Sequence, residues 1–278
     1  MVSRQPAYSG RGPDNRTVGG KFPHPYGFFG ENRNPPYSTS GYSQLSPSLG
    51  RPPTLITMEN DWMEMMLQFA DSSLPVGGYA HSFGLEGLCQ SRDLQSDDDL
   101  RLFLLRDVRH SLITVDVPLM LRAYQAALDL DGDRIHYWDE VAWAMRPTRQ
   151  LREAAGRIGR QTWQLYTKTW RELDGNHFYR YQAPVVSGVI FAERGVPQKA
   201  AYSTLVYQTF SALVQSALKL LPIGPSAAQS ILKDGLAQMA GELPAAAALT
   251  DDELGSFNPL WDVAASRHER ADARLFIS

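Results

Sequence analysis

The residues most suited to chemistry lie together in one short segment. Asp71, Ser72 and Ser73 are followed by His81 and Ser82, and a serine activated by a histidine is a common hydrolase nucleophile. No G-x-S-x-G turn accompanies them, and Asp71 and Ser72 serve equally well to end one helix and cap the next. The segment is therefore expected to form a helix end and a helix cap. A helical serine hydrolase is kept only as an alternative.

Residues that bind metals or nucleotides are scattered along the chain. The six histidines are His24, His81, His110, His136, His177 and His268. None lies four residues from another, so no helix face presents two of them. No G-x-x-x-x-G-K-[ST] loop is present to hold a phosphate. The sequence predicts no resident metal, no directly bound cofactor and no NTPase activity.

Composition narrows the class of protein further. The chain has 278 residues, a formal net charge of −3 and a single cysteine, Cys89, which favours a reducing compartment and a cytoplasmic protein. The charge gives no overall attraction to nucleic acid or to an anionic membrane. No run of about 18 apolar residues predicts a membrane span, and the first residues do not read as a secretory signal.

Two irregular features remain as candidate interaction sites. Leu74-Pro75-Val76-Gly77-Gly78 combines one fixed dihedral with two glycines that permit left-handed backbone, so we expect a shaped loop. The C-terminus is densely charged from Ser266 to Arg274 and then ends in Leu275-Phe276-Ile277. The loop either merely connects helices or contacts a partner. The tail either packs on its own core or inserts into a partner's groove.

The elements that must position these features are predicted to be helices. Apolar spacing, acidic first turns, and Pro or Gly at the ends predict helices over 58–69, 97–108, 118–128, 134–145, 148–171, 183–192, 197–221 and 225–239. The β-branched run at 183–192 would also suit a strand, but no second strand exists to pair with it. The helix from Pro197 carries an apolar stripe over four turns and is expected to be the core helix.

The chain is predicted to divide near residue 57. Residues 1–53 contain nine Pro, eight Gly and a local charge of +4, from six basic and two acidic residues, and they show no apolar periodicity. We therefore expect residues 1–57 to be a disordered extension. Residues 58–278 are expected to form a single all-α helical bundle of about eight to ten helices.

Three separated motifs resemble the UreF family of urease accessory proteins. They are LQFADSSLPVGGYAHSFGLE at 67–86, LKLLPIG at 218–224, and S-R-H-E at 266–269 followed by R-L-F at 274–276. The motifs occur in the family's order over about residues 62–278. The alternative is a generic helical adaptor unrelated to urease.

The resemblance implies a non-enzymatic scaffold and chaperone of metallocentre assembly. Members of this family are usually dimeric and join the UreD (UreH) protein and the GTPase UreG in the complex that inserts nickel into apo-urease. Nickel and GTP would be handled by these partners, with the scaffold controlling when GTP hydrolysis releases the metal. His81, Glu86 and His110 are the candidates for any nickel binding in this chain.

The resemblance also implies where partners bind. Because the family's C-terminal tail packs on UreD, Arg274 is assigned a charged contact, and Leu275 and Phe276 act as apolar anchors. The full set of expected partner-binding residues is Pro75, Val76, Gly77, Gly78, Arg267, His268, Glu269, Arg274, Leu275 and Phe276.

Overall fold

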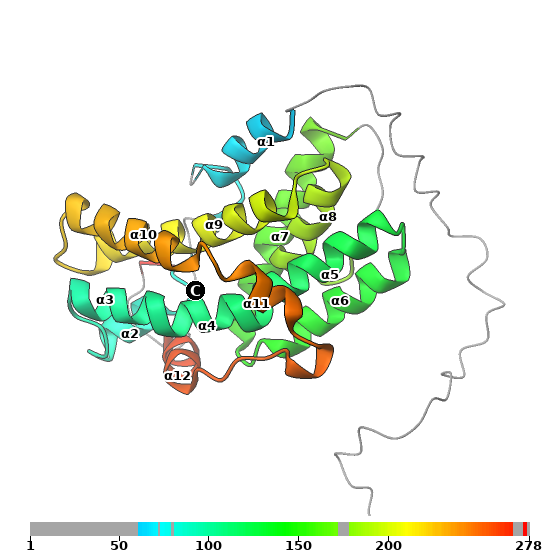
Figure 1. Ribbon diagram of the computed structural model, residues 1–278. Coiled ribbons are helices and arrows are strands. Elements are labelled where there is room, and N and C mark those ends of the chain that lie inside the picture. The colour runs from blue at the N-terminus through cyan, green and yellow to red at the C-terminus, as the bar shows by residue number, and fades with distance from the viewer. Residues whose placement is uncertain (1–60, 72, 79–80, 172–177, 269–274, 277–278) are drawn as a thin grey trace, which may run out of the picture. The chain divides into compact units, whose positions relative to one another are not determined.

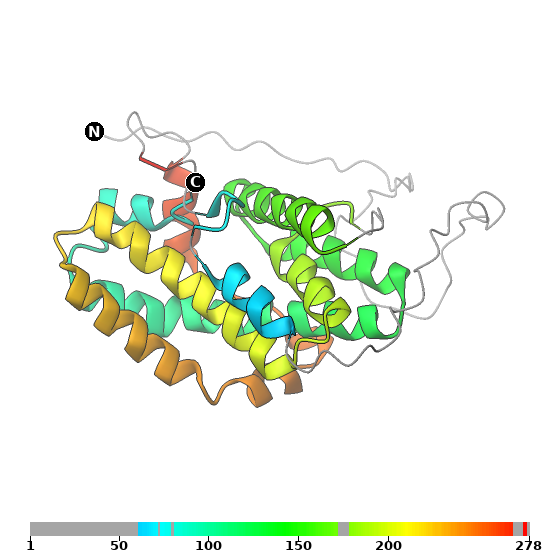
Figure 2. The same cartoon turned by 90° about the horizontal axis from the view of Figure 1, so that it is seen from above.

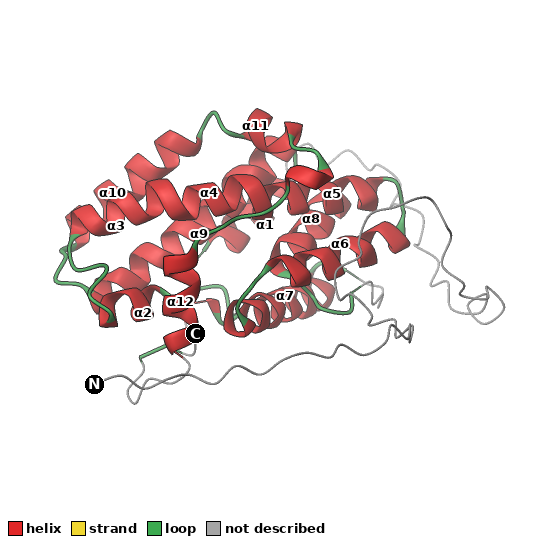
Figure 3. Cartoon of the chain, turned by 90° about the horizontal axis from the view of Figure 1, so that it is seen from below, coloured by secondary structure: helices red, strands yellow, loops and turns green. Residues whose placement is uncertain are grey.

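A computed structural model describes the chain from residue 61 onward. It leaves out residues 72, 79–80, 172–177, 269–274 and 277–278. All described residues belong to the compact unit Pro47–Ser278. The predicted disordered extension at 1–57 lies outside the described residues. Within them every regular element is a helix, which confirms the all-α prediction (Figures 1 and 3).

The elements follow one another in a simple order. They are α1 (Asp61–Ala70), α2 (Leu85–Gln90), α3 (Asp97–Phe103), α4 (Arg109–Ser111), α5 (Val117–Leu128), α6 (Gly132–Met145), α7 (Arg149–Thr169), α8 (Ala183–Glu193), α9 (Gln198–Leu220), α10 (Pro225–Met239), α11 (Leu243–Ala248) and α12 (Pro259–His268). Two π-helical segments, η2 (Leu104–Val108) and η3 (Leu112–Asp116), join α3, α4 and α5 without a break. If α3, η2, α4, η3 and α5 are counted as one continuous helix, the described residues contain ten separate helices, which agrees with the predicted number of about eight to ten.

Side chains close in sequence cap two of the helix starts. The Ser96 hydroxyl accepts the Asp99 backbone N–H at 3.1 Å, while the Asp99 carboxylate accepts the Ser96 N–H at 3.0 Å. This reciprocal pair satisfies two backbone donors at the start of α3. Thr148 caps α7 in a similar way, through its side-chain oxygen and the Leu151 N–H. These ends are therefore determined by residues close in sequence.

The predicted helix 118–128 corresponds to α5, with Pro118 in its first turn, but η3 leads directly into it, so the helical chain runs from Asp97 to Leu128 without a break. A proline inside a helix has no N–H for the carbonyl four residues earlier, which here belongs to Thr114. The Gly255 N–H, from a distant loop, donates to the Thr114 carbonyl at 3.1 Å. The π-helical turn η3 lies directly before the proline. Tertiary structure thus supplies the missing donor.

The predicted core helix α9 buries one face, but α8 is buried more completely. Every residue from Pro184 to Ala192 is buried, and α5, α6, α7 and α9 all contact this helix (Figure 1). A Cβ at Gly188 would lie 2.3 Å from the Met120 carbonyl oxygen, so only glycine permits α5 to approach this closely. On the other side of α9, α10 runs alongside it (Figure 2).

The start of α8 is held by one buried carboxylate. Asp139 of α6 has no exposed surface and accepts four backbone N–H groups, from residues 179–182, at 3.0, 2.7, 3.0 and 2.7 Å. Burial raises the pKa of this carboxyl, and the four donors oppose that shift. Among the donors, Tyr181 has φ of 58°, a left-handed conformation that is costly for a tyrosine. The carboxylate therefore stabilises a strained approach to the central helix.

We expect Asp139→Ala to lower the free energy of unfolding by about 3–5 kcal/mol, because several buried N–H groups would lose their acceptor. Urea denaturation followed by circular dichroism measures this change. Glu140→Ala is the matched control, since the side chain of the adjacent Glu140 is 46% exposed and pairs with Arg180 across the surface; it should cost less than about 1 kcal/mol. Equal losses in the two variants would contradict the role given to Asp139.

Candidate functional site

The loop after α1 has the shaped conformation that its sequence predicts. The Ser73 N–H donates to the Asp71 carboxylate at 2.8 Å, and the Val76 N–H donates to the Leu74 carbonyl at 2.7 Å. Gly77 has φ of 76°, and a Cβ there would lie 2.9 Å from Oε1 of Gln161 on α7. Left-handed backbone is thus confirmed at Gly77, and the loop lies directly against α7.

The chemical groups around this loop have structural contacts. The Ser82 hydroxyl accepts the Glu86 N–H at 3.4 Å at the start of α2. Asp71 forms a turn with Ser73, and these hydrogen bonds lower the pKa of its carboxyl. His81 is 4% exposed, and burial together with nearby Arg157 lowers its pKa to about 4. Its ring is therefore neutral at pH 7 and a weak base, and Ser72 lies outside the described residues.

Candidate ligands of a metal ion are not gathered into one place in the described part of the chain. There, no three side chains of His, Cys, Asp or Glu converge. His110 is exposed on α4, whereas Glu86 is buried on α2. Burial and the Glu86 charge raise the pKa of the Cys89 thiol to about 11, so the thiolate is scarce at pH 7.

Glu86 holds the end of the chain. Its side chain is 3% exposed, and its two carboxylate oxygens accept the N–H groups of Leu275 at 2.8 Å and Phe276 at 3.1 Å. Phe276 is 6% exposed and its ring lies 5.2 Å from Nζ of Lys219. Leu275 is 72% exposed. The two apolar tail residues therefore differ, because Phe276 packs on this chain and Leu275 faces outward.

Helix α12 links the tail to the segment after the loop. A Cβ at Gly87 would lie 2.3 Å from the Ala264 carbonyl oxygen, so α12 crosses α2 at close range. Trp261 Nε1 donates to the Phe83 carbonyl at 2.5 Å, where Phe83 has φ of 52°. These contacts bring the 83–87 segment, α12 and the tail together.

The other expected partner-binding residues are distributed over this region. Pro75 is exposed, and Val76, Gly77 and Gly78 are half-buried beside α7. Arg267 is exposed near the end of α12, and His268 is the last residue of that helix. Glu269 and Arg274 lie outside the described residues.

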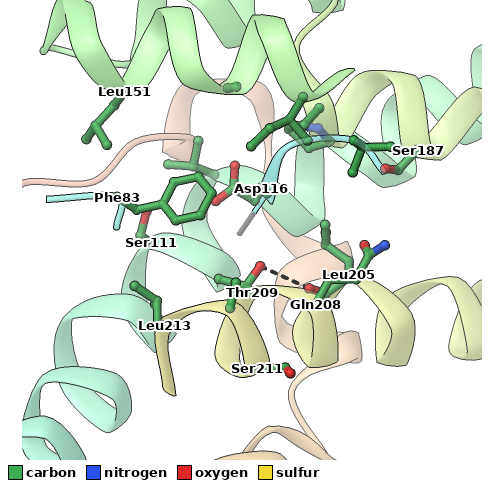
Figure 4. Close-up of a pocket in the computed structure, with 18 of the residues that line it drawn as sticks. Phe83, Ser111, Asp116, Leu151, Ser187, Leu205, Gln208, Thr209, Ser211 and Leu213 are labelled. Carbon is green, nitrogen blue, oxygen red and sulfur yellow. Dashed lines mark hydrogen bonds between the residues drawn. The ribbon is translucent and has the colours of Figure 1, made fainter. Parts of the chain in front are cut away.

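An apolar cavity of about 250 Å³, which the sequence did not reveal, lies beside the loop. Leu74 and Val76 line it from the loop, Leu151 from α7 and Leu213 from α9. Figure 4 shows the ring of Phe83 within it, with Asp116 nearby; Asp116 pairs with Arg146 at 2.6 Å. The walls of the cavity come from segments that are far apart in the sequence, so no single motif could have predicted it.

Comparisons with known proteins all give the same family. The family model UreF matches residues 94–235. A urease accessory protein UreF from a Nostoc species is 30% identical over 219 residues, which cover 77% of this chain and 94% of that protein. UreF of Trichormus variabilis is 28% identical over 80% of this chain and 99% of its own length. UreF of a Klebsiella pneumoniae strain is 30% identical over 77% of this chain and 96% of its own length.

We expect Glu86→Gln to weaken the anchoring of the tail, because a side-chain NH₂ would replace one of the oxygens that accept the two N–H groups. Amide hydrogen exchange at Leu275 and Phe276 should accelerate at least tenfold. Glu64→Gln, the same change at an exposed position on α1, is the control and should leave both rates unchanged. Equal protection in Glu86→Gln and the unaltered chain would contradict the anchor.

Acid should destabilise the fold in part through His81. The unfolded chain binds a proton on this ring below pH 6.5, whereas the folded chain binds it only near pH 4, so stability falls as pH decreases through that window. We expect His81→Gln to remove up to about 3 kcal/mol of the pH dependence between pH 6.5 and 4. Urea titrations at half-unit pH intervals measure the difference; parallel curves for the two proteins would refute it.

Proposed function

The chain belongs to the UreF family of urease accessory proteins, and from this premise we propose that it is a non-catalytic scaffold of urease maturation. In this proposal it joins UreD (UreH) and the GTPase UreG in the cytoplasm, as a dimer, and the assembly delivers nickel to apo-urease. Nickel is then the cargo of the assembly, and GTP is bound by the partner. The proposal is supported by the family membership and by the exposed, firmly held surfaces described above.

The single observation that carries the docking role is the arrangement of the tail. Glu86 and the buried Phe276 hold the backbone, while Leu275 is left 72% exposed at the end of the chain. An exposed leucine on an anchored backbone loses little conformational freedom when a partner covers it. We assign Leu275 as the apolar contact with UreD, and we propose Arg267, His268, Glu269 and Arg274 as polar or charged contacts with the same partner. Phe276 anchors the tail on this chain.

The second proposed contact is the loop Pro75–Gly78. Val76 and Gly77 lie against α7 beside the apolar cavity, and Pro75 is exposed. A partner side chain that covers Pro75 would meet a backbone already held by turn hydrogen bonds. The scaffold then acts on UreG by binding one of its conformations more tightly than another, which requires no catalytic residue.

Co-expression of the full chain with UreD and UreG tests the assembly directly. We expect one ternary complex to elute in size-exclusion chromatography. If the three proteins are folded and elute separately, the scaffold function is wrong for this chain.

We expect Leu275→Asp to weaken UreD binding at least tenfold, because it removes the outward-facing leucine and leaves the Glu86 contacts in place. Leu130→Asp is the control, since Leu130 is 51% exposed and lies at the turn between α5 and α6. Biolayer interferometry with immobilised UreD measures both. An unchanged dissociation constant for Leu275→Asp would remove the tail from the interface.

A further inference from the structure

The charge of α7 is opposite to that of the whole chain. This helix carries Arg149, Arg152, Arg157, Arg160 and Lys168 against a single acid, Glu153. Its net charge is therefore +4, in a chain of net charge −3. A local excess of this size on an acidic protein marks a surface that attracts anionic groups.

Close packing places further arginine and aromatic residues beside this helix. Gly156 and Gly159 face the segment before α8: a Cβ at Gly156 would lie 2.9 Å from the Arg180 carbonyl oxygen, and one at Gly159 would lie 1.9 Å from that of Tyr181. The two glycines therefore allow the backbone at 180–181 to lie directly on α7. Arg157 and Arg160, on the same helix, remain exposed.

Aromatic rings hold three of the guanidinium groups in place. Arg160 lies 4.2 Å from the ring centroid of Tyr181. Arg152 and Arg180 lie 5.5 and 4.8 Å from the ring centroid of Trp143. A guanidinium stacked on a ring is ordered before binding and still presents N–H donors at its edge.

Acidic side chains neutralise this surface only in part. Glu153 pairs with Arg157 at 3.1 Å, and Glu140 accepts from Nε of Arg180 at 3.0 Å. In the part of the chain that the structure describes, Arg160 has its ring contact with Tyr181 and no ion pair. Positive charge and N–H donors thus remain available to a ligand.

We propose that these four residues, Arg152, Arg157, Arg160 and Arg180, form an α7 arginine surface that binds a carboxylate-rich face of a partner protein in the maturation assembly. The inference rests on the proposed scaffold function and adds a third contact to the loop and the tail. Arginine recognises carboxylates through paired N–H donors, and ordered arginines lose little entropy on binding.

A protein fits this surface better than a nucleic acid does. Single-stranded nucleic acids bind where exposed rings stack on bases. Tyr181 is only 9% exposed and is covered by Arg160, and the Trp143 ring is engaged by two guanidinium groups. The rings therefore orient arginines and do not offer a stacking platform, whereas the charges remain suited to Asp and Glu.

The test compares two double charge reversals in the full chain. Arg157→Glu with Arg160→Glu changes the α7 arginine surface, and Lys199→Glu with Lys233→Glu makes the same charge change at exposed positions on α9 and α10. Each protein is titrated with UreD, UreG and apo-urease between 50 and about 300 mM salt. We expect the α7 variant to bind one of these at least tenfold more weakly and with a shallower salt dependence. The control variant should stay within about twofold of the unaltered chain.

The outcomes separate this inference from the function on which it rests. If the unaltered chain binds its partners and the α7 variant binds all of them equally well, the inference is wrong and the scaffold function stands. If the unaltered chain binds none of them, the scaffold function fails first. A single-stranded 20-nucleotide probe that binds the unaltered chain and not the α7 variant, with protein binding intact, would assign the surface to nucleic acid and overturn the proposal.

Circular dichroism establishes that each variant is folded. Arg157→Gln with Arg160→Gln serves as a second, milder variant, because it removes the two charges without adding acids. Its affinity for the affected partner should lie between those of the unaltered chain and the reversed variant. Affinity equal to that of the unaltered chain would again count against the proposal.

Discussion

Four backbone N–H groups converge on the carboxylate of Asp139, and the position of the central helix depends on them. A buried carboxylate is stable only when donors replace the water it has lost. These donors are consecutive, so the carboxylate determines both where the chain turns and where α8 begins. From there α8 enters the core with no polar face, and Gly188 lets α5 lie directly against it.

The conformation of the α7 arginine surface depends on the buried Asp139 contact. The same four hydrogen bonds hold Tyr181 in a left-handed conformation, and its ring then lies under Arg160. Gly156 and Gly159 bring that segment onto α7 without a gap. A guanidinium held in this way differs from one on a free surface helix, because less of its freedom remains to be lost when a ligand binds.

A second buried carboxylate organises the other end of the molecule. Glu86, like Asp139, is satisfied by consecutive backbone N–H groups, here those of Leu275 and Phe276. Backbone donors have no side chain to order, so they anchor a chain terminus at low entropic cost. Neighbouring residues consequently take opposite roles, with Phe276 inside and Leu275 outside. In a scaffold, this arrangement exposes the Leu275 side chain to a partner while Glu86 keeps the tail bound to its own chain.

Local signals in the sequence were sufficient for much of the fold. The acidic first turn of α3, helical spacing, and the left-handed loop at Gly77 each depend on residues a few positions apart, and each is present in the structure. The helical assignment of 183–192 also holds, because an isolated strand has no partner for its hydrogen bonds. The three separated motifs were enough to indicate the family.

By itself, then, the sequence determined most of the longer helices, where most of these end, and which family the chain joins, but its local signals did not predict α2, α11 or α12. Only the tertiary structure decided that Asp139 caps α8 from 40 or more residues away, that Gly255 completes the helix through Pro118, and that Phe276 turns inward. Helix formation depends on hydrogen bonds within a few residues. The satisfaction of a buried carboxylate or an orphaned carbonyl depends on which distant backbone is packed beside it, and that is a property of the folded chain.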